Sequence, residues 1–493
     1  MLIIGSNMLF NSFSFLIFFP TVTVLYFLVP QAYRWFFLLT ASCIFYMAFI
    51  PVYVLVLALT ISIDYTAALF IEKSEGRRRK WYLIISIVST CTVLFIFKYF
   101  NFFNSNLGQV ARFFHWNYSI ENLSLILPIG LSFHTFQSLS YVIEVYRKNY
   151  KAEHHFGIYA LYVMFYPQLV AGPIERPGNL LPQFYEKHFF DYQRVIDGLK
   201  LMVWGFFKKV VIADRLALVV DKVYSDPTQY TGLPLIAAAI SFAIQVYCDF
   251  SGYSDIAIGS AQVMGFRLMD NFNRPLFSAS VPDFWRRWHI SLMTWFRDYV
   301  YIPLGGNRVD KGRWYFNIFF TFTLSGLWHG ANWGMVLWGS FNGLYVILSD
   351  LTENLRKRGL TLTRLDHHPF LHRGLGIALT FFLFWFTLII FRTRNLSDAL
   401  YVMTHLGTGL MAPGGLWTSV ESLYRVLPKY ELITVLIAIG WMIFIETIEK
   451  QGKMRHPFSE KPVWARWTVY YVCILFLIFF GEYNDQAFIY FQF

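Results

Sequence analysis

The sequence predicts an all-α, polytopic integral membrane protein with about 11 or more membrane helices. Hydrophobic residues make up 56% and aromatic residues 20% of the 493 positions, which is too apolar for a set of soluble domains. Short loops rich in lysine and arginine separate the apolar runs. Because such loops face the cytoplasm, they account for the net charge of +11 without nucleic acid as a partner.

The first part of the chain contains four predicted spans and one basic loop. Three close-spaced apolar runs, at 13–29, 35–50 and 52–71, are followed by five basic residues within 72–80. We expect this loop in the cytoplasm, and counting back three crossings places the N-terminus outside. The first run has no basic segment before it and no small-residue cleavage site after it, which favours a retained span over a signal peptide. A fourth span, 81–100, returns to the outer side.

The middle of the chain departs from simple spans. A run at 123–145 is interrupted by proline and glycine. The run 156–171 has only about 16 residues where ~20 are needed to cross, so we expect a re-entrant or interfacial element there. Four charged residues fall within 201–220, and a lipid-exposed span does not tolerate them cheaply. The number of crossings therefore stays open from 156 to 265.

Two carboxylates, Asp249 and Asp255, lie in the apolar run 233–264. Carboxylates at membrane depth usually face a cavity or a partner charge, which makes Arg286 and Arg287 candidate partners. The alternative is that this half of the run already reaches the membrane interface.

His329 is the only histidine within an uncharged stretch, 314–349, that contains no Asp, Glu, Lys or Arg. A lone titratable group in an apolar segment is a functional-site hypothesis by default. As one helix the stretch would be about 54 Å long, beyond a ~30 Å hydrocarbon core, so we expect two elements or a broken helix. Gly326, Gly330 and Gly334 leave one helix side bare for close approach. The alternative is plain helix packing with the histidine as a buried polar contact.

A second histidine, His289, lies in an aromatic segment that reads as one helix over 283–299. Apolar and aromatic residues recur at three- and four-residue steps, at Trp285, Trp288, His289, Leu292, Trp295, Phe296 and Tyr299. Arg286 and Arg287 fall on the other side, a pattern typical of a helix at a membrane interface. His289 is then directed inward, as a functional residue or as a core histidine satisfied by one hydrogen bond.

The remaining spans are expected at 375–391, 432–445 and 469–480, with basic loops at 355–373 and 449–466. The last thirteen residues lack Lys and Arg, which suggests an outside C-terminus. The four cysteines show no paired spacing, so we expect no metal site of that type. The sequence has no phosphate-binding loop and no serine nucleophile elbow.

Eight motifs together carry a family resemblance: FNSFSFLIFFP near the start, LPIGLSFHTFQ, LVAGPIERP, VYCDFSGYSDIAIG, NFNRP, DFWRRWHISLMTWFRDYVYIPLGGNR, GLWHGANW and the terminal FIYFQF. This combination resembles the membrane-bound O-acyltransferase family, and within it the bacterial alginate O-acetyltransferase branch. Because the motifs extend over nearly the whole chain, we expect one domain, 1–493, with its catalytic core at about 123–350. The resemblance implies re-entrant and interfacial helices around a central tunnel. The family's essential histidine matches His329, and its second signature position matches His289.

The resemblance also implies the chemistry. An acetyl group would be taken from a cytoplasmic thioester, with acetyl-CoA as donor substrate and no bound cofactor, for O-acetylation of an exported polysaccharide such as alginate. His329 would act as general base on the acceptor hydroxyl, an effect that typically contributes about 10² to 10⁴-fold. Trp328 and Asn332 flank it as supporting residues, and Asn332 orients the imidazole, polarises the carbonyl or is a structural amide.

The acetyl group must reach the outer side of the inner (plasma) membrane, yet the predicted outer segments are short. They comprise about 20 residues near Asn101 and about 40 between Arg392 and Glu431, too few for a glycan-binding domain. We therefore expect a separate extracytoplasmic acetyltransferase to receive the group, with direct transfer to a glycan as the competing route. The alternatives are D-alanyl or other acyl transfer to a cell-envelope polymer and, in a different class, a transporter or channel.

Overall fold

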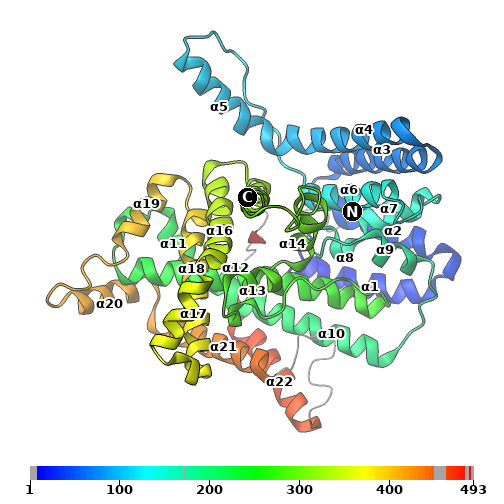
Figure 1. The fold of residues 1–493 in the computed structure, drawn as a ribbon. Helices are drawn as coiled ribbons and strands as arrows, with labels where there is room; N and C mark the ends of the chain where they lie inside the picture. The colour runs from blue at the N-terminus through cyan, green and yellow to red at the C-terminus, as the bar shows by residue number, and fades with distance from the viewer. Residues whose placement is uncertain (1–7, 171, 449–461, 484–487, 490–493) are drawn as a thin grey trace. The chain divides into compact units, whose positions relative to one another are not determined.

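The structure, a computed structural model, describes residues 8–170, 172–448, 462–483 and 488–489. The regular structure of these residues consists of helices, without strands (Figure 1). Contacts divide the chain into two compact units: unit 1, Met1–Met202 with Ile256–Met269, and unit 2, Val203–Asp255 with Asp270–Phe493. The predicted all-α class is confirmed, whereas the single domain stays a prediction.

Six helices in the described part of the chain are long and apolar enough to cross a bilayer. They are Pro51–Lys73, Gly76–Phe113, Leu233–Met264, Pro369–Arg392, Lys429–Ile448 and Val463–Phe480. Phe13–Leu28 is apolar but shorter. These helices confirm a multi-pass membrane protein.

Unit 1 consists mainly of the N-terminal helices. They are α1 (Phe13–Leu28), α2 (Gln31–Met47), α3 (Val54–Lys73), α4 (Gly76–Leu94), α5 (Phe100–Phe113), α6 (Leu131–Tyr146), α7 (Phe156–Met164), α8 (Tyr166–Leu169) and α9 (Pro177–Leu180). The helix predicted at 123–145 begins later, at Leu131, because Gly130 is left-handed with a φ of 76°. Within 156–171, α7 and α8 are both too short to cross, which agrees with the predicted re-entrant or interfacial element.

Two helices contribute to both units, α10 (Tyr192–Phe206) and α12 (Leu233–Met264). Unit 2 adds α11 (Asp214–Ser225), α13 (Val281–Arg287), α14 (Ile290–Phe296), α15 (Lys311–His329), α16 (Trp333–Leu351), α17 (Glu353–Leu362), α18 (Pro369–Arg392), α19 (Leu396–His405), α20 (Gly415–Val426), α21 (Lys429–Ile448) and α22 (Val463–Phe480). A π-helical segment, Phe207–Ala213, joins α10 to α11 and carries two lysines. The predicted basic loop 449–466 lies mostly outside the described residues.

Candidate active site

His289 lies in a break between two short helices. α13 ends at Arg287, and α14 begins directly after His289, whose backbone is left-handed with a φ of 44° and a ψ of 53°. The prediction of one helix across 283–299 is therefore wrong. A left-handed conformation costs a residue with a side chain about 1–2 kcal/mol, so neighbouring contacts must hold it.

Asn271 supplies these contacts from the loop that follows α12. Its backbone carbonyl accepts the Ile290 N–H at 2.8 Å, and its side-chain oxygen accepts the Ser291 hydroxyl at 2.6 Å. The Asn271 amide in turn donates to the Ser254 hydroxyl at 3.1 Å. Because Asn271 and both serines are buried, these bonds form in a low dielectric and fix the turn at His289. Asn271 is the first residue of the motif NFNRP, but sequence reasoning gave it no role.

His329 is the last residue of α15, and α16 begins after Asn332, so the predicted broken helix is confirmed. Gly330 is extended and ends α15. The Asn332 side chain accepts the Met335 N–H at 2.9 Å and so caps α16. This bond favours the structural-amide interpretation of Asn332.

Close packing of α15 against α16 places His329 firmly. A Cβ on Gly326 would lie 2.2 Å from the Met335 carbonyl oxygen and 2.9 Å from the Gly339 Cα. Only a glycine allows the two backbones to approach this closely. The predicted bare helix side thus exists at Gly326, whereas Gly330 and Gly334 lie outside α15.

Aromatic rings surround His329. The ring centroids of Trp328, Trp338 and Phe391 lie 4.9, 5.1 and 5.7 Å from that of His329. These residues come from α15, α16 and α18. His329 is 6% exposed, so its imidazole lies in the apolar environment that the uncharged stretch predicts.

His289 belongs to the same aromatic cluster. Its ring lies 4.5 Å from Phe250 of α12 and 6.3 Å from Trp328. Since Trp328 also contacts His329, one indole ring touches both histidines. The structure thus brings the two predicted catalytic residues and Trp328 together inside unit 2.

The predicted charge partners of Asp249 and Asp255 are wrong. Lys209 Nζ lies 2.7 Å from both Asp249 Oδ1 and Asp214 Oδ1, and Lys208 Nζ lies 2.7 Å from Asp255 Oδ2. Both lysines come from the π-helical segment beside α12. They compensate carboxylates that the protein interior would otherwise disfavour. The two arginines expected there lie elsewhere, with Arg287 Nε 3.0 Å from Asp283.

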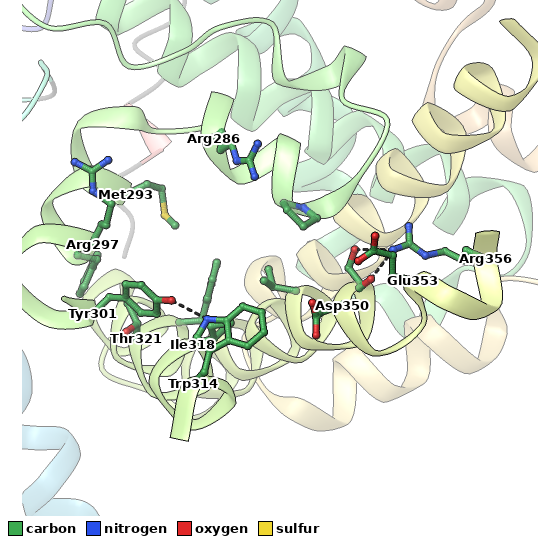
Figure 2. A pocket seen from close by; sticks show the side chains of 15 residues that line it. Arg286, Met293, Arg297, Tyr301, Trp314, Ile318, Thr321, Asp350, Glu353 and Arg356 are labelled. Atoms are coloured by element: carbon green, nitrogen blue, oxygen red, sulfur yellow. Dashed lines mark hydrogen bonds between the residues drawn. The ribbon is translucent and has the colours of Figure 1, made fainter. Parts of the chain in front are cut away.

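Arg286 instead lines a cavity of about 470 Å³ in unit 2. Figure 2 shows Arg297 and Arg356 at opposite ends of this cavity, with Arg286 between them along its upper edge. Trp314 and Tyr301 form part of the opposite wall, and the indole N–H donates to the tyrosine hydroxyl at 2.7 Å. Among the described residues, the lining includes neither histidine.

Within the described residues, no group of three or more His, Cys, Asp or Glu side chains is placed to hold a metal ion. An imidazole can both accept and donate a proton, so the two buried imidazoles of this aromatic cluster are suited to proton transfer.

Comparison with known proteins identifies the class. The model of "MBOAT, membrane-bound O-acyltransferase family" matches residues 152–391, which include both histidines. Together with the multi-spanning helical fold, this match makes the protein a membrane-embedded O-acyltransferase.

Similar proteins extend the match beyond that region. The chain is 39% identical to a "probable alginate O-acetylase" of Pseudomonas aeruginosa, over 80% of this chain and 73% of the relative. It is 35% identical to a protein of the same description from Pseudomonas putida, over 99% and 100% of the two chains. A "peptidoglycan O-acetyltransferase" of Helicobacter pylori is 33% identical over 80% and 79%. The chain belongs to the membrane-bound O-acyltransferase family.

Proposed function

We propose that this acyltransferase moves an acetyl group from a cytoplasmic thioester across the inner membrane, with His329 as general base. The observation that carries the proposal is the burial of His329 at the end of α15, inside an aromatic cluster that also holds His289. We infer the reaction class, O-acyl transfer, from the family. We infer that the acyl group is acetyl from the relatives that are named for O-acetylation.

The proposed step needs one proton acceptor and no external reagent. The His329 imidazole takes the proton of the acceptor hydroxyl while the hydroxyl oxygen attacks the carbonyl carbon of the thioester. As the tetrahedral intermediate collapses, the C–S bond breaks and the leaving sulfur takes the proton back from the imidazolium. The products are an acetyl ester, a free thiol and a neutral His329, so the base is regenerated in each cycle.

The cavity of unit 2 supports a phosphate-bearing donor such as acetyl-CoA. Three arginines line it together with two carboxylates, Asp350 and Glu353. One of the arginines, Arg356, lies in the basic run 355–373 that the sequence predicts to be cytoplasmic. Arginine is suited to phosphate because its planar group donates several hydrogen bonds. Phe296, Phe322 and Trp314 add an apolar wall for the uncharged part of such a donor.

The acceptor side of the proposal involves a second protein. We place exported polysaccharide, with alginate or peptidoglycan as the classes that the relatives' names suggest, on the outer side. The outer segments of this chain are short, so a separate extracytoplasmic acetyltransferase with a hydroxyl nucleophile would receive the group.

Reconstitution in sealed vesicles tests the relay. Acetyl-CoA is enclosed, polysaccharide is added outside, and acetyl esters on the glycan are measured with and without the candidate partner. We expect consumption of acetyl-CoA and acetylation that requires the partner. Efficient acetylation without any second protein would refute the relay, and consumption of a D-alanyl thioester but not acetyl-CoA would favour the alternative acyl group. Uncoupled solute flux without thioester turnover would identify a channel.

A further inference from the structure

Near the end of the chain, two described residues lie in the core of unit 2. Phe488 is fully buried and Ile489 is 3% exposed, although the sequence there reads as an outer tail. The Ile489 backbone N–H donates to Asp249 Oδ2 at 2.8 Å. Asp249 therefore has two partners, since its other oxygen pairs with Lys209. A charged acceptor makes this hydrogen bond about twice as strong as a neutral one.

The hydrogen bond places the Phe488 ring against two aromatic residues of α12. Its centroid lies 4.4 Å from Tyr253 in a stacked arrangement and 5.7 Å from Phe250. Phe250 is fully buried, and its ring lies 4.5 Å from His289. A continuous set of ring contacts thus leads from Phe488 through Phe250 to His289.

We propose that Phe488 and Ile489 are positioning residues of the histidine site. The bond from Ile489 to Asp249 holds Phe488 behind Phe250, and Phe250 then fixes the His289 ring next to Trp328. Without Phe488, Phe250 would face an empty space and could move away from His289, because packed interiors lose contact energy at any gap. This inference rests on the proposed function for its catalytic consequence, but the ring contacts can be tested without it.

The activity test compares two buried phenylalanines. Phe488→Ala should lower kcat on the order of tenfold, since misplacement of a catalytic group by a fraction of an ångström is costly. The KM for acetyl-CoA should not change, because Phe488, Tyr253 and Phe250 do not line the cavity. Phe15→Ala is the matched control, as Phe15 is also fully buried but packs on Phe10, Phe19 and Phe45 in unit 1. It should reduce the yield of folded protein and leave the kcat of the folded fraction unchanged.

A second pair of variants isolates the hydrogen bond. Ile489→Pro removes the N–H that Asp249 accepts, whereas Ile489→Val keeps it. Only the proline variant should lower kcat. If Phe488→Ala does not fold, the two Ile489 variants still test whether this segment positions the histidine site. Phe488→Leu, which keeps a large apolar side chain, should then retain most of the activity.

An independent readout is the ring ¹⁵N signal of His289 in histidine-labelled protein, assigned by its loss in His289→Ala. We expect it to shift in Phe488→Ala and Ile489→Pro but not in Phe15→Ala. Unchanged signals, or unchanged kcat in folded Phe488→Ala, would overturn the proposal. Absence of thioester turnover in the wild type would instead overturn the proposed function, and the histidine signals would still test the positioning.

Discussion

At the scale of single residues, the left-handed turn at His289 depends on Asn271. We expect Asn271→Ala to destabilise the protein by about 1–3 kcal/mol, because it leaves the buried Ser254 and Ser291 hydroxyls without this partner. Acetyl transfer should fall as well, since the turn no longer holds His289. Asn342→Ala is the control, because Asn342 is also buried but its side chain donates to Trp338 O of its own helix. Thermal unfolding in detergent and thioester turnover measure the two effects, and equal losses in both variants would contradict this role.

The buried lysine Lys209 gives a second prediction. Lys209→Met should destabilise the protein by about 3–5 kcal/mol, because Asp214 and Asp249 would remain buried without their cation. Lys311→Met should change stability by no more than about 1 kcal/mol, since Lys311 is exposed and lies 3.7 Å from Asp350. Denaturation of both variants in one detergent compares them. Similar free energies of unfolding for Lys209→Met and Lys311→Met would show that the ion pairs of Lys209 contribute little to stability.

Residue-level sequence reasoning found some of these features and missed others. It selected His329 as a candidate site residue because a single histidine in an uncharged stretch is a functional-site hypothesis, and the catalytic role of His329 stays a proposal. It could not pair Asp249 with Lys209, because a contact between residues 40 positions apart depends on how α12 packs. It also missed the turn at His289, since the aromatic repeat continues through the break and the stabilising Asn271 belongs to another loop.

At the scale of elements, the close packing of α15 against α16 depends on the absence of a side chain at Gly326. Gly326→Ala should lower the free energy of unfolding by about 1–3 kcal/mol, because the added Cβ would overlap the Met335 carbonyl oxygen. Gly359→Ala should be neutral or stabilise by up to about 1 kcal/mol, since α17 leaves open space there. The midpoints of thermal unfolding test both changes. A stable Gly326→Ala variant would mean that the two helices can separate without loss.

Element lengths explain which parts of the fold were predictable. The break near Gly330 followed from the length of the uncharged run, because one helix would exceed the bilayer. The bounds of α12 matched the predicted run 233–264, since continuous apolar sequence leaves little choice of ends. The run 123–145 was expected to be interrupted by proline and glycine, and α6 indeed begins at Leu131, directly after the left-handed Gly130.

At the scale of the whole molecule, the proposed orientation in the membrane rests on the basic loops of the sequence. Glu75→Cys, in a chain whose four native cysteines are replaced by alanine, should react with a membrane-impermeant maleimide only from the cytoplasmic side. Glu75 is exposed and immediately precedes α4, so the reagent can reach it. Labelling only from the outer side would reverse the topology, including the proposed outside positions of both termini.

The central claim is that His329 removes the proton from the acceptor hydroxyl. The most direct measurement is the release of free CoA thiol from acetyl-CoA by purified His329→Ala, reconstituted with the acceptor partner and polysaccharide and normalised to folded protein. We predict at least about a hundredfold lower turnover than the wild type, with the same unfolding temperature within a few degrees. Near-normal turnover by a folded His329→Ala variant would contradict the account.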